Sequence, residues 1–205
     1  MMRARPKLVL FDFDGVLVRY SHERRVEHLA DATGCSPLRV VEALFDSGLE
    51  TEYDCGQVDT AQYLARLGRD LESPVDEATW IASRVAGYHV EAGVADRVLV
   101  ASRRARVGVL TNNGALLPEA ARRVLPALFP MLEGAVLCSG ALGVRKPEPE
   151  IFRRALAHFG AIAQETLFVD DSPRNVEGAR SAGLHAEHTP DAATLASVLQ
   201  LYDLA

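Results

Sequence analysis

The apolar residues of the chain fall into two patterns. Short continuous apolar runs, which are typical of strands buried on both faces of a parallel sheet, occupy residues 8–11, 106–110 and 166–169. After residue 106, where strand-like and helix-like segments alternate, two further strands are expected near 135–138 and 184–187. Helix-like segments separate the runs after residue 106. The pattern therefore predicts an α/β fold with a Rossmann-like parallel sheet flanked by helices.

The residues between the first two runs show only helical periodicity. The helical segments are about 23–33, 37–44, 60–67 and 76–86, and glycines and Pro74 separate them. None of these segments alternates as a strand does, so they predict a small bundle of short helices. The chain then divides into an α/β core made of residues 1–16 and 94–205 and an inserted all-helical domain made of residues 17–93.

Two carboxylates follow the first apolar run. Asp12 and Asp14 stand in the sequence Asp12-Phe13-Asp14-Gly15, directly after residues 8–11. The carboxyl ends of parallel strands are where open α/β sheets bind their ligands. Gly15 permits a turn that lets both carboxylates face one ligand, so that one can attack while the other moves a proton.

Polar residues also end the second and third runs. Thr111, Asn112 and Asn113 follow the second run, Asp170 and Asp171 follow the third, and Lys146 precedes a helix-like segment that starts near residue 151. Because the carboxyl ends of parallel strands meet at one edge of the sheet, we expect these side chains to form one site.

The expected charge of this site indicates a metal ion. Asp12, Asp14, Asp170 and Asp171 would repel one another, and Lys146 supplies only one positive charge. Magnesium is a hard cation that combines carboxylates with water and phosphate oxygens. Magnesium, an ammonium group, a threonine hydroxyl and backbone amides are also the parts that phosphoryl transfer requires. The site therefore predicts Mg²⁺ as cofactor and a phosphate ester as substrate.

These four motifs, in this order and approximate spacing, resemble the haloacid dehalogenase (HAD) superfamily, in particular its phosphatase-type members. The resemblance covers most of the chain and implies a HAD-like core with a helical cap at residues 17–93. It implies that Asp12 is the nucleophile, Asp14 the general acid and base, and Thr111 and Lys146 the phosphate holders. The implied metal ligands are Asp12, Asp14 through its backbone carbonyl, Asp170 and Asp171.

The reaction that follows has two steps. Asp12 attacks phosphorus to give an aspartyl phosphate while Asp14 protonates the leaving oxygen, and Asp14 then takes a proton from the attacking water. The expected substrate contacts are Asn112, Asn113, Tyr53 and Tyr20. Tyr53 begins a polar break between cap helices, residues 53–57, which resembles the acidic-x-Gly loop of sugar-phosphate phosphatases.

Each motif alone is also compatible with a structural role. Residues 111–114 fit a turn, Lys146 fits a surface charge, and residues 170–173 fit a helix N-cap followed by proline. A helix that begins near Pro173 would in addition point its amides toward the site. Taken together, the motifs favour a catalytic site.

Four functions fit this core. A phosphatase that hydrolyses a small phosphomonoester, such as a sugar phosphate, is favoured. A phosphomutase of the β-phosphoglucomutase type would differ only in how the cap keeps water from the intermediate. A 2-haloacid dehalogenase is disfavoured by Asp14, because halide departure needs no proton donor. A non-catalytic binding module would be indicated by loss of Asp12 or Asp14, and both are present.

The composition of the chain limits the classes of molecule that it is expected to bind. The chain has 205 residues and a net charge of −6, which argues against a nucleic-acid surface. Its three cysteines lack metal-ligand spacing, and no apolar stretch approaches the about 20 residues of a membrane helix. The basic N-terminus reaches Asp12 too soon to be a signal peptide. We expect a cytoplasmic monomer or homodimer whose partner is a small phosphorylated metabolite, and neither nucleic acid nor membrane.

Two pairs of residues have more than one interpretation. Trp80 and Leu49 fit either a dimer surface or the core of the cap. His185 and His188 invite a metal site, but three residues apart on an expected strand they point to opposite faces. We interpret both histidines as surface or packing residues.

Overall fold

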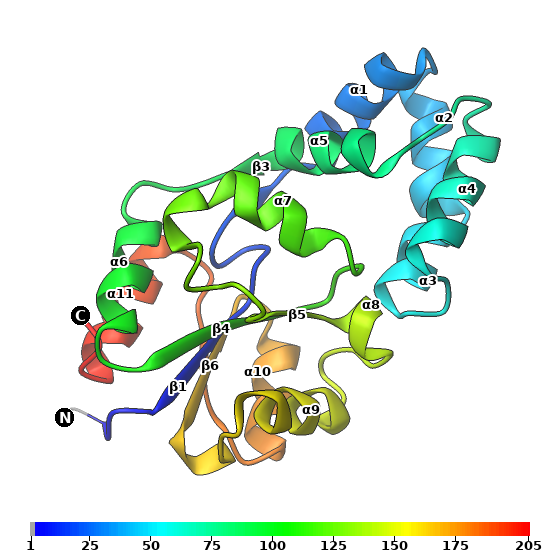
Figure 1. Ribbon diagram of the computed structural model, residues 1–205. Coiled ribbons are helices and arrows are strands. Elements are labelled where there is room, and N and C mark those ends of the chain that lie inside the picture. Colours follow the sequence, from blue (N-terminus) through cyan, green and yellow to red (C-terminus); the bar gives the residue numbers. More distant parts are fainter. Residues whose placement is uncertain (1–2) are drawn as a thin grey trace.

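Five strands form one parallel sheet in the order β5-β4-β1-β6-β7 in the computed structural model, which describes residues 3–205 (Figure 1). The strands are β1 (Leu8–Phe11), β4 (Arg106–Thr111), β5 (Val136–Cys138), β6 (Thr166–Asp170) and β7 (His185–His188). All five expected strands are therefore present, and the predicted Rossmann-like fold is confirmed.

Strand β1 lies at the centre of the sheet. It pairs with β4 on one side and β6 on the other, with Leu8 opposite both Arg106 and Thr166. All four β1 residues are buried, as expected for a continuous apolar strand covered on both faces. The chain runs from β1 to β4 and β5 on one side and returns to β6 and β7 on the other. The strand order therefore reverses at β1, which is where such sheets bind ligands.

The helices of the core cover both faces of the sheet (Figure 1). One face carries α6 (Val94–Ser102), α7 (Leu117–Val124) and α11 (Ala192–Leu201), and the other carries α9 (Pro149–Phe159) and α10 (Pro173–Ser181). Shorter connecting pieces are η2 (Pro126–Leu128), α8 (Ser139–Leu142) and η3 (Ala163–Glu165). The two helical layers leave the carboxyl ends of the strands to be covered by the inserted domain.

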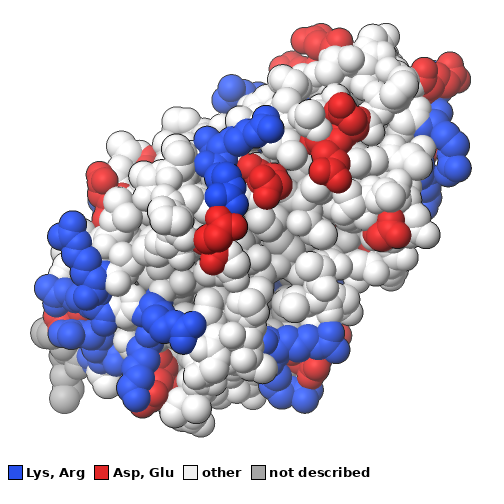
Figure 2. Space-filling view, viewed as in Figure 1, with Lys and Arg blue, Asp and Glu red and all other residues white. Residues whose placement is uncertain are grey.

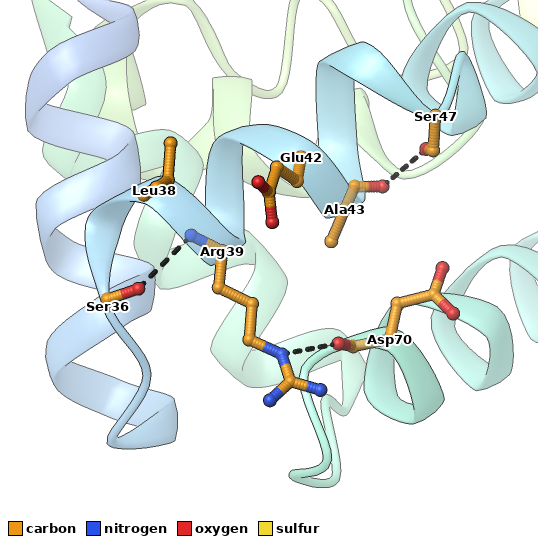
Figure 3. A pocket seen from close by; sticks show the side chains of 7 residues that line it. All are labelled: Ser36, Leu38, Arg39, Glu42, Ala43, Ser47 and Asp70. Atoms are coloured by element: carbon orange, nitrogen blue, oxygen red, sulfur yellow. Dashed lines mark hydrogen bonds between the residues drawn. The ribbon is translucent and has the colours of Figure 1, made fainter.

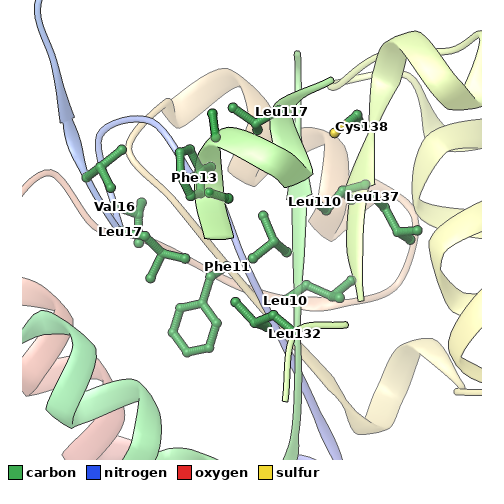
Figure 4. Packing of buried hydrophobic residues seen from close by; sticks show 14 of the residues in the cluster. Leu10, Phe11, Phe13, Val16, Leu17, Leu110, Leu117, Leu132, Leu137 and Cys138 are labelled. Atoms are coloured by element: carbon green, nitrogen blue, oxygen red, sulfur yellow. The ribbon is translucent and has the colours of Figure 1, made fainter. Parts of the chain in front are cut away.

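The centre of the core is apolar. Figure 4 shows Leu10 and Phe11 of β1 packed with Leu110 of β4 and Leu132, all of them fully or almost fully buried. Phe13, which stands between the two motif aspartates, is also completely buried. The turn after β1 is therefore anchored by an apolar side chain, which fixes the direction of the polar residues on either side of it.

The inserted domain is a layer of short helices over the carboxyl edge of the sheet (Figure 1). Its elements are α1 (His22–Thr33), α2 (Pro37–Val41), the π-helix η1 (Glu42–Asp46), α3 (Leu49–Asp54), α4 (Thr60–Asp70) and α5 (Glu77–Gly87). The four predicted helices are present, with residues 37–44 divided between α2 and η1. Helix α3 was not predicted, because its six residues are too few to show a helical period.

The predicted all-helical cap needs one correction. Two short strands, β2 (Arg19–Tyr20) and β3 (Tyr88–His89), pair antiparallel where the chain enters and leaves the cap. Two residues a strand are too few to show alternation, so the sequence pattern did not reveal them. The two passages of the chain between core and cap therefore lie side by side.

The interior of the cap combines apolar packing with a buried ion pair. Trp80 and Leu49 are both buried within the cap, so they belong to the cap's own core. Arg25 contacts Glu50 through both of its terminal nitrogens, at 2.5 and 3.0 Å. The hydroxyl of Tyr63 donates a further hydrogen bond to Glu50 at 2.6 Å. The charges of Arg25 and Glu50 are thus paired inside the bundle.

A groove of about 500 Å³ lies on the outer side of the cap (Figure 3). It is lined by Ser36, Leu38, Arg39, Glu42, Ala43, Ser47 and Asp70. Its polar groups bond to one another: Arg39 donates to the Asp70 carbonyl at 2.8 Å, and Ser47 donates to the Ala43 carbonyl at 2.7 Å. The guanidinium of Arg39 and the hydroxyl of Ser47 therefore have partners within the cap. No helix among residues 3–205 is long and apolar enough to cross a membrane.

Candidate active site

The ends of β1, β4 and β6 bring the predicted site residues together. Asp12 directly follows β1, Thr111 ends β4 and Asp170 ends β6. Lys146, from the loop before α9, places its Nζ 2.8 Å from Asp12 Oδ1 and 2.7 Å from Asp170 Oδ2. All four residues are at most 6% exposed. The predicted convergence of these strand ends is present in the structure.

Asn112 fixes the backbone of Lys146. Its side-chain oxygen accepts a hydrogen bond from the Lys146 amide at 2.8 Å, and its side-chain nitrogen donates to the Lys146 carbonyl at 3.0 Å. These two bonds hold the loop before α9 against the end of β4. Asn112 therefore helps to orient the buried ammonium group of Lys146.

Asp170 is held by the start of α10. Its carboxylate accepts hydrogen bonds from the Ser172 amide at 2.8 Å and from the Asn175 side chain at 3.0 Å. Pro173 is the first residue of α10, as the sequence indicates. With Lys146 on its other oxygen, Asp170 has partners on both sides and a fixed orientation.

Three carboxylates form an acidic centre. Asp12, Asp170 and Asp171 each offer an oxygen, and these oxygens lie within 4.8 Å of one another. Lys146 provides one positive charge against three negative ones. Burial raises the pKa of Asp12 well above its usual range, against the influence of Lys146, and Asp170 adds to the rise. Burial and Asp170 also raise the pKa of Asp171. Oxygen ligands with an excess of negative charge fit a hard divalent cation.

Gly15 allows this centre to form. Its φ of +87° lies in the left-handed region, and a Cβ at this position would stand 2.1 Å from Asp171 Oδ2. Only a residue without a side chain lets the turn after β1 approach the acidic residue after β6 this closely.

The carboxylate of Asp14 lies outside the acidic centre, which corrects the expected cluster of four carboxylates. Its Oδ2 accepts a hydrogen bond from Asn113 Nδ2 at 2.8 Å and lies 3.5 Å from Arg84 Nη2. The chain turns at Gly15, so the two motif aspartates diverge. Asp12 faces the acidic centre and Asp14 faces the cap, and a metal role for Asp14 is limited to its backbone carbonyl.

A cleft of about 440 Å³ opens over these groups. Its lining consists of Asp12, Asp14, Gly15, Arg19, Tyr20, Thr111, Asn112, Asn113, Lys146, Asp171 and Asn175. Of the expected substrate contacts, Tyr20, Asn112 and Asn113 are therefore in place to meet a ligand. A second cleft of about 680 Å³, which includes Arg145 and Arg174, shares three of these residues and adjoins the first.

Tyr53 does not line either cleft. It is 1% exposed, its ring stacks on Tyr63, and its hydroxyl is bonded to Thr60 and to the Leu116 amide. The side chain thus packs the end of α3 against the core. The expected substrate contact is corrected to a structural one, because its polar tip faces a backbone amide.

Two arginines of this region were not predicted. Arg19 lines the cleft and donates to the Gly15 carbonyl at 2.8 Å. Arg84, in α5, is almost completely buried against Asp14 and Asn113. Arginines are usually exposed, so nothing in the helical pattern of residues 76–86 marked Arg84.

Charges on the outside of the molecule are mixed. Figure 2 shows basic and acidic side chains scattered over one face, with neutral surface between them. In the basic cluster at residues 103–106, Arg104 pairs with Asp203 at 2.7 Å, and Arg106 donates to the Phe159 carbonyl at 2.6 Å. These arginines therefore have partners within the protein.

The carboxyl ends of a parallel sheet carry a buried aspartate, a lysine and an acidic centre beneath a helical cap, which is the arrangement of a capped α/β enzyme. Residues 6–183 match the family model of haloacid dehalogenase-like hydrolases, and the chain belongs to this family. The protein is therefore a HAD-like hydrolase, as the motifs predicted.

Relatives and solved structures agree with this assignment. A phosphatase of Mycobacterium tuberculosis (strain CDC 1551 / Oshkosh) is 32% identical over 186 residues, which cover 87% of this chain and 84% of the relative. Phosphoglycolate phosphatase of Rhodospirillum rubrum is 31% identical over 198 residues, covering 87% and 77%. A HAD family enzyme of Bacteroides thetaiotaomicron, solved with magnesium and inorganic phosphate, shares the fold with a TM-score of 0.72 and 21% identity, covering 89% and 93%.

Proposed function

We propose that this protein is a magnesium-dependent phosphatase that hydrolyses a small phosphomonoester, such as a sugar phosphate, through an aspartyl-phosphate intermediate. The observation that carries the proposal is the buried contact of Lys146 with Asp12 beside the acidic centre. It combines a carboxylate nucleophile with a cation for the phosphoryl oxygens. The phosphatase names of the relatives support the same reaction.

In the first step, Asp12 bonds to phosphorus. Phe13 and Lys146 both contact Asp12 Oδ1, so Oδ2 is the oxygen that attacks. As the new bond to phosphorus forms, the ester bond breaks, and Asp14 gives its proton to the leaving oxygen. Thr111 ends β4 and lines the cleft, where it would hold the phosphoryl group, and Lys146 would balance the charge on the phosphoryl oxygens.

In the second step, water attacks the aspartyl phosphate. Asp14 takes a proton from the water, the bond between Asp12 and phosphorus breaks, and inorganic phosphate leaves. The two aspartates thus return to their initial protonation states. Two separate carboxylate environments suit this division of work, since Asp12 contacts Lys146 whereas Asp14 contacts Asn113.

Magnesium would be held by Asp12, Asp170 and Asp171, whose oxygens converge. When bound, it neutralises the phosphoryl oxygens and the excess negative charge of the three carboxylates. The cap at residues 17–93 would cover the phosphoryl group and limit the size of the leaving group. Tyr20, Asn112 and Asn113 would contact the substrate from the cleft.

Phosphate release tests the proposal. Inorganic phosphate is measured from a chromogenic aryl phosphate and a panel of sugar phosphates, with magnesium and with excess chelator. We expect release that requires magnesium and that falls by about 1000-fold or more in Asp12→Asn. Magnesium binding is partly retained in this variant, because the amide keeps an oxygen ligand. Asp96→Asn, an exposed change in α6, is the matched control and keeps full activity.

Two results would contradict the proposal. If Asp12→Asn turned over substrate at nearly the rate of the unchanged protein, Asp12 would not be the nucleophile. No release from any compound, with magnesium still bound, would instead support a phosphomutase or a binding module, and isomerisation of sugar phosphates would then be assayed.

A further inference from the structure

Arg84 is a buried cation that the cap extends toward the core. It lies in α5, and its side chain is 4% exposed. Three aromatic rings surround its guanidinium carbon, at 4.6 Å from the centroid of Tyr20, 5.2 Å from Tyr88 and 5.7 Å from Trp80. Rings on several sides hold a guanidinium group in place and favour its charge. The orientation of Arg84 is therefore determined by the cap.

The fixed guanidinium determines the orientation of Asn113. Arg84 Nη2 donates a hydrogen bond to Asn113 Oδ1. Because the oxygen of this amide faces Arg84, its nitrogen must face the other way. That nitrogen donates to Asp14 Oδ2 and to Thr111 Oγ1, both at 2.8 Å. One cap residue thus sets the hydrogen bonds of two residues in the active site.

The same contacts orient Asp14 itself. Its Oδ2 has Asn113 Nδ2 at 2.8 Å and Arg84 Nη2 at 3.5 Å, whereas Oδ1 has no hydrogen-bond partner among the described residues. Oδ1 is also buried, whereas the Asp14 side chain as a whole is 30% exposed and lines the cleft, so Oδ2 is the oxygen that faces the leaving group. A carboxyl oxygen has two lone-pair positions, so Oδ2 can accept from Asn113 and still carry the proton. A proton carrier must be held within hydrogen-bond reach of the leaving oxygen to be effective.

We propose that Arg84 is a positioning residue for proton transfer: through Asn113 and through its own charge, it aims Asp14 at the leaving group. This inference rests on the proposed phosphatase function and adds a cap residue to it. Protonation of the leaving group then depends on the cap being seated on the core, because Arg84 and Asp14 come from the two different parts.

A series of aryl phosphates tests the inference, because a leaving group of low basicity needs little protonation. The value of kcat/KM is measured for phenyl phosphate and for dinitrophenyl phosphate, with magnesium present. For Arg84→Met we expect a fall of about 100-fold with phenyl phosphate and of less than about 3-fold with dinitrophenyl phosphate. Arg84→Lys, which keeps the charge, recovers part of the activity on phenyl phosphate.

Arg25→Met is the matched control. Arg84 Nη1 lies 3.6 Å from Glu50 Oε1, and Arg25, which is equally buried in the cap, contacts the same carboxylate. Arg25 has no hydrogen bond or ion pair with Asp14 or Asn113 among the described residues. If a loosened cap were the cause, Arg25→Met and Arg84→Met would each lower kcat/KM by the same factor for both aryl phosphates. The inference would then be wrong. Thermal unfolding of each variant confirms that the protein measured is folded.

A double substitution shows whether Arg84 acts through Asp14. In an Asp14→Asn background, Arg84→Met should lower kcat/KM for phenyl phosphate by less than about 3-fold further. Full additivity of the two losses would overturn the inference. The unchanged protein is assayed first: no phosphate from dinitrophenyl phosphate would refute the proposed function itself, which separates that failure from a failure of Arg84 to position Asp14.

Discussion

The hydroxyl of Tyr53, in the cap, accepts a hydrogen bond from the backbone amide of Leu116, in the core, at 3.0 Å. The ring of Tyr53 also occupies the space above Gly114, where a Cβ would stand 2.1 Å from a ring carbon. Beside it, Ser139 donates a hydrogen bond to the Asp54 carbonyl at 2.5 Å. The end of α3 is therefore docked on the loop before α7 and on the first residue of α8.

Tyr53→Phe should weaken this docking. The change leaves the buried Leu116 amide without its partner, so we expect the free energy of unfolding to fall by about 1–3 kcal/mol. Hydrogen exchange at the Leu116 amide is the local measurement, and it should become faster. Tyr63→Phe is the control, since the Tyr63 hydroxyl bonds only within the cap. Unchanged protection of Leu116 in Tyr53→Phe would contradict the expectation.

Glu50→Gln should destabilise the cap. Burial alone raises the pKa of Glu50, but Arg25, Arg84 and Tyr63 together lower it below its usual value, so the carboxylate is charged in the folded protein. Removing this charge leaves the Arg25 guanidinium buried without a counterion, at a cost of about 3–5 kcal/mol in denaturant unfolding.

Glu52→Gln provides the comparison. Glu52 forms a similar contact with Arg66 at 2.6 Å, but both side chains are about one-third exposed. A pair in this environment contributes about 0–1 kcal/mol. Equal losses in Glu50→Gln and Glu52→Gln would show that burial does not decide the strength of the two pairs.

Gly15→Ala should damage the acidic centre. The added Cβ would lie 2.1 Å from Asp171 Oδ2, so either the turn after β1 or Asp171 must move. A displacement of about 1 Å at reacting groups can cost about 100-fold in rate, and we expect a loss of this order in phosphate release. Isothermal titration should also show weaker magnesium binding.

Gly160→Ala is the control that separates the effect of backbone strain from the effect of the steric clash with Asp171. Gly160 also has a positive φ, +56°, but a Cβ there would meet nothing within 4 Å. Both variants should lose stability. Loss of phosphate release in Gly160→Ala as large as in Gly15→Ala would argue against the steric explanation.

Asp54→Asn should change the pH dependence of stability. Burial, followed by the nearby Glu50, raises the pKa of Asp54 to about 7. The folded protein then binds this proton more tightly than the unfolded chain does, so the contribution of Asp54 to stability falls as the pH rises from about 4 to 7. Asp54→Asn should therefore raise the midpoint of thermal unfolding at pH 8 relative to pH 5.

Asp76→Asn should behave in the opposite sense. Asp76 caps α5 through the Thr79 amide, and this hydrogen bond holds the pKa of Asp76 below its usual range. Its ionised form is favoured by folding, so its contribution is present at neutral pH and is lost in acid. If both variants shifted in the same direction between pH 5 and pH 8, the explanation for Asp54 would fail.

The central strand β1 was predictable because it is a continuous apolar run. Residues 8–11 are apolar at every position, which only burial on both faces explains, and the structure pairs them on both sides. Asp12, Thr111 and Asp170 then follow from their positions at strand ends. Topology alone brings them to one edge, so their convergence needed no knowledge of side-chain contacts.

The cap contacts were not predictable in the same way. Tyr53 and Arg84 both have an apolar body and a polar end, and the sequence does not reveal which neighbour the polar end meets. The partner of Tyr53 is an amide 63 residues away, and the oxygen of Asn113 that Arg84 contacts is 29 residues away. Neither contact follows a helical or strand period, because each depends on how the cap is seated.

The pairing of Arg19 with His89 and Tyr20 with Tyr88 places the entry and exit of the cap side by side. The cap residues between β2 and β3 therefore form one insertion that leaves the core and returns to it at adjacent points. Such an insertion can become longer or shorter, or be replaced, without changing the spacing of β1 and β4. The β2–β3 pair is thus a fixed attachment point for the inserted domain. That domain can vary while the residues at the strand ends keep their positions.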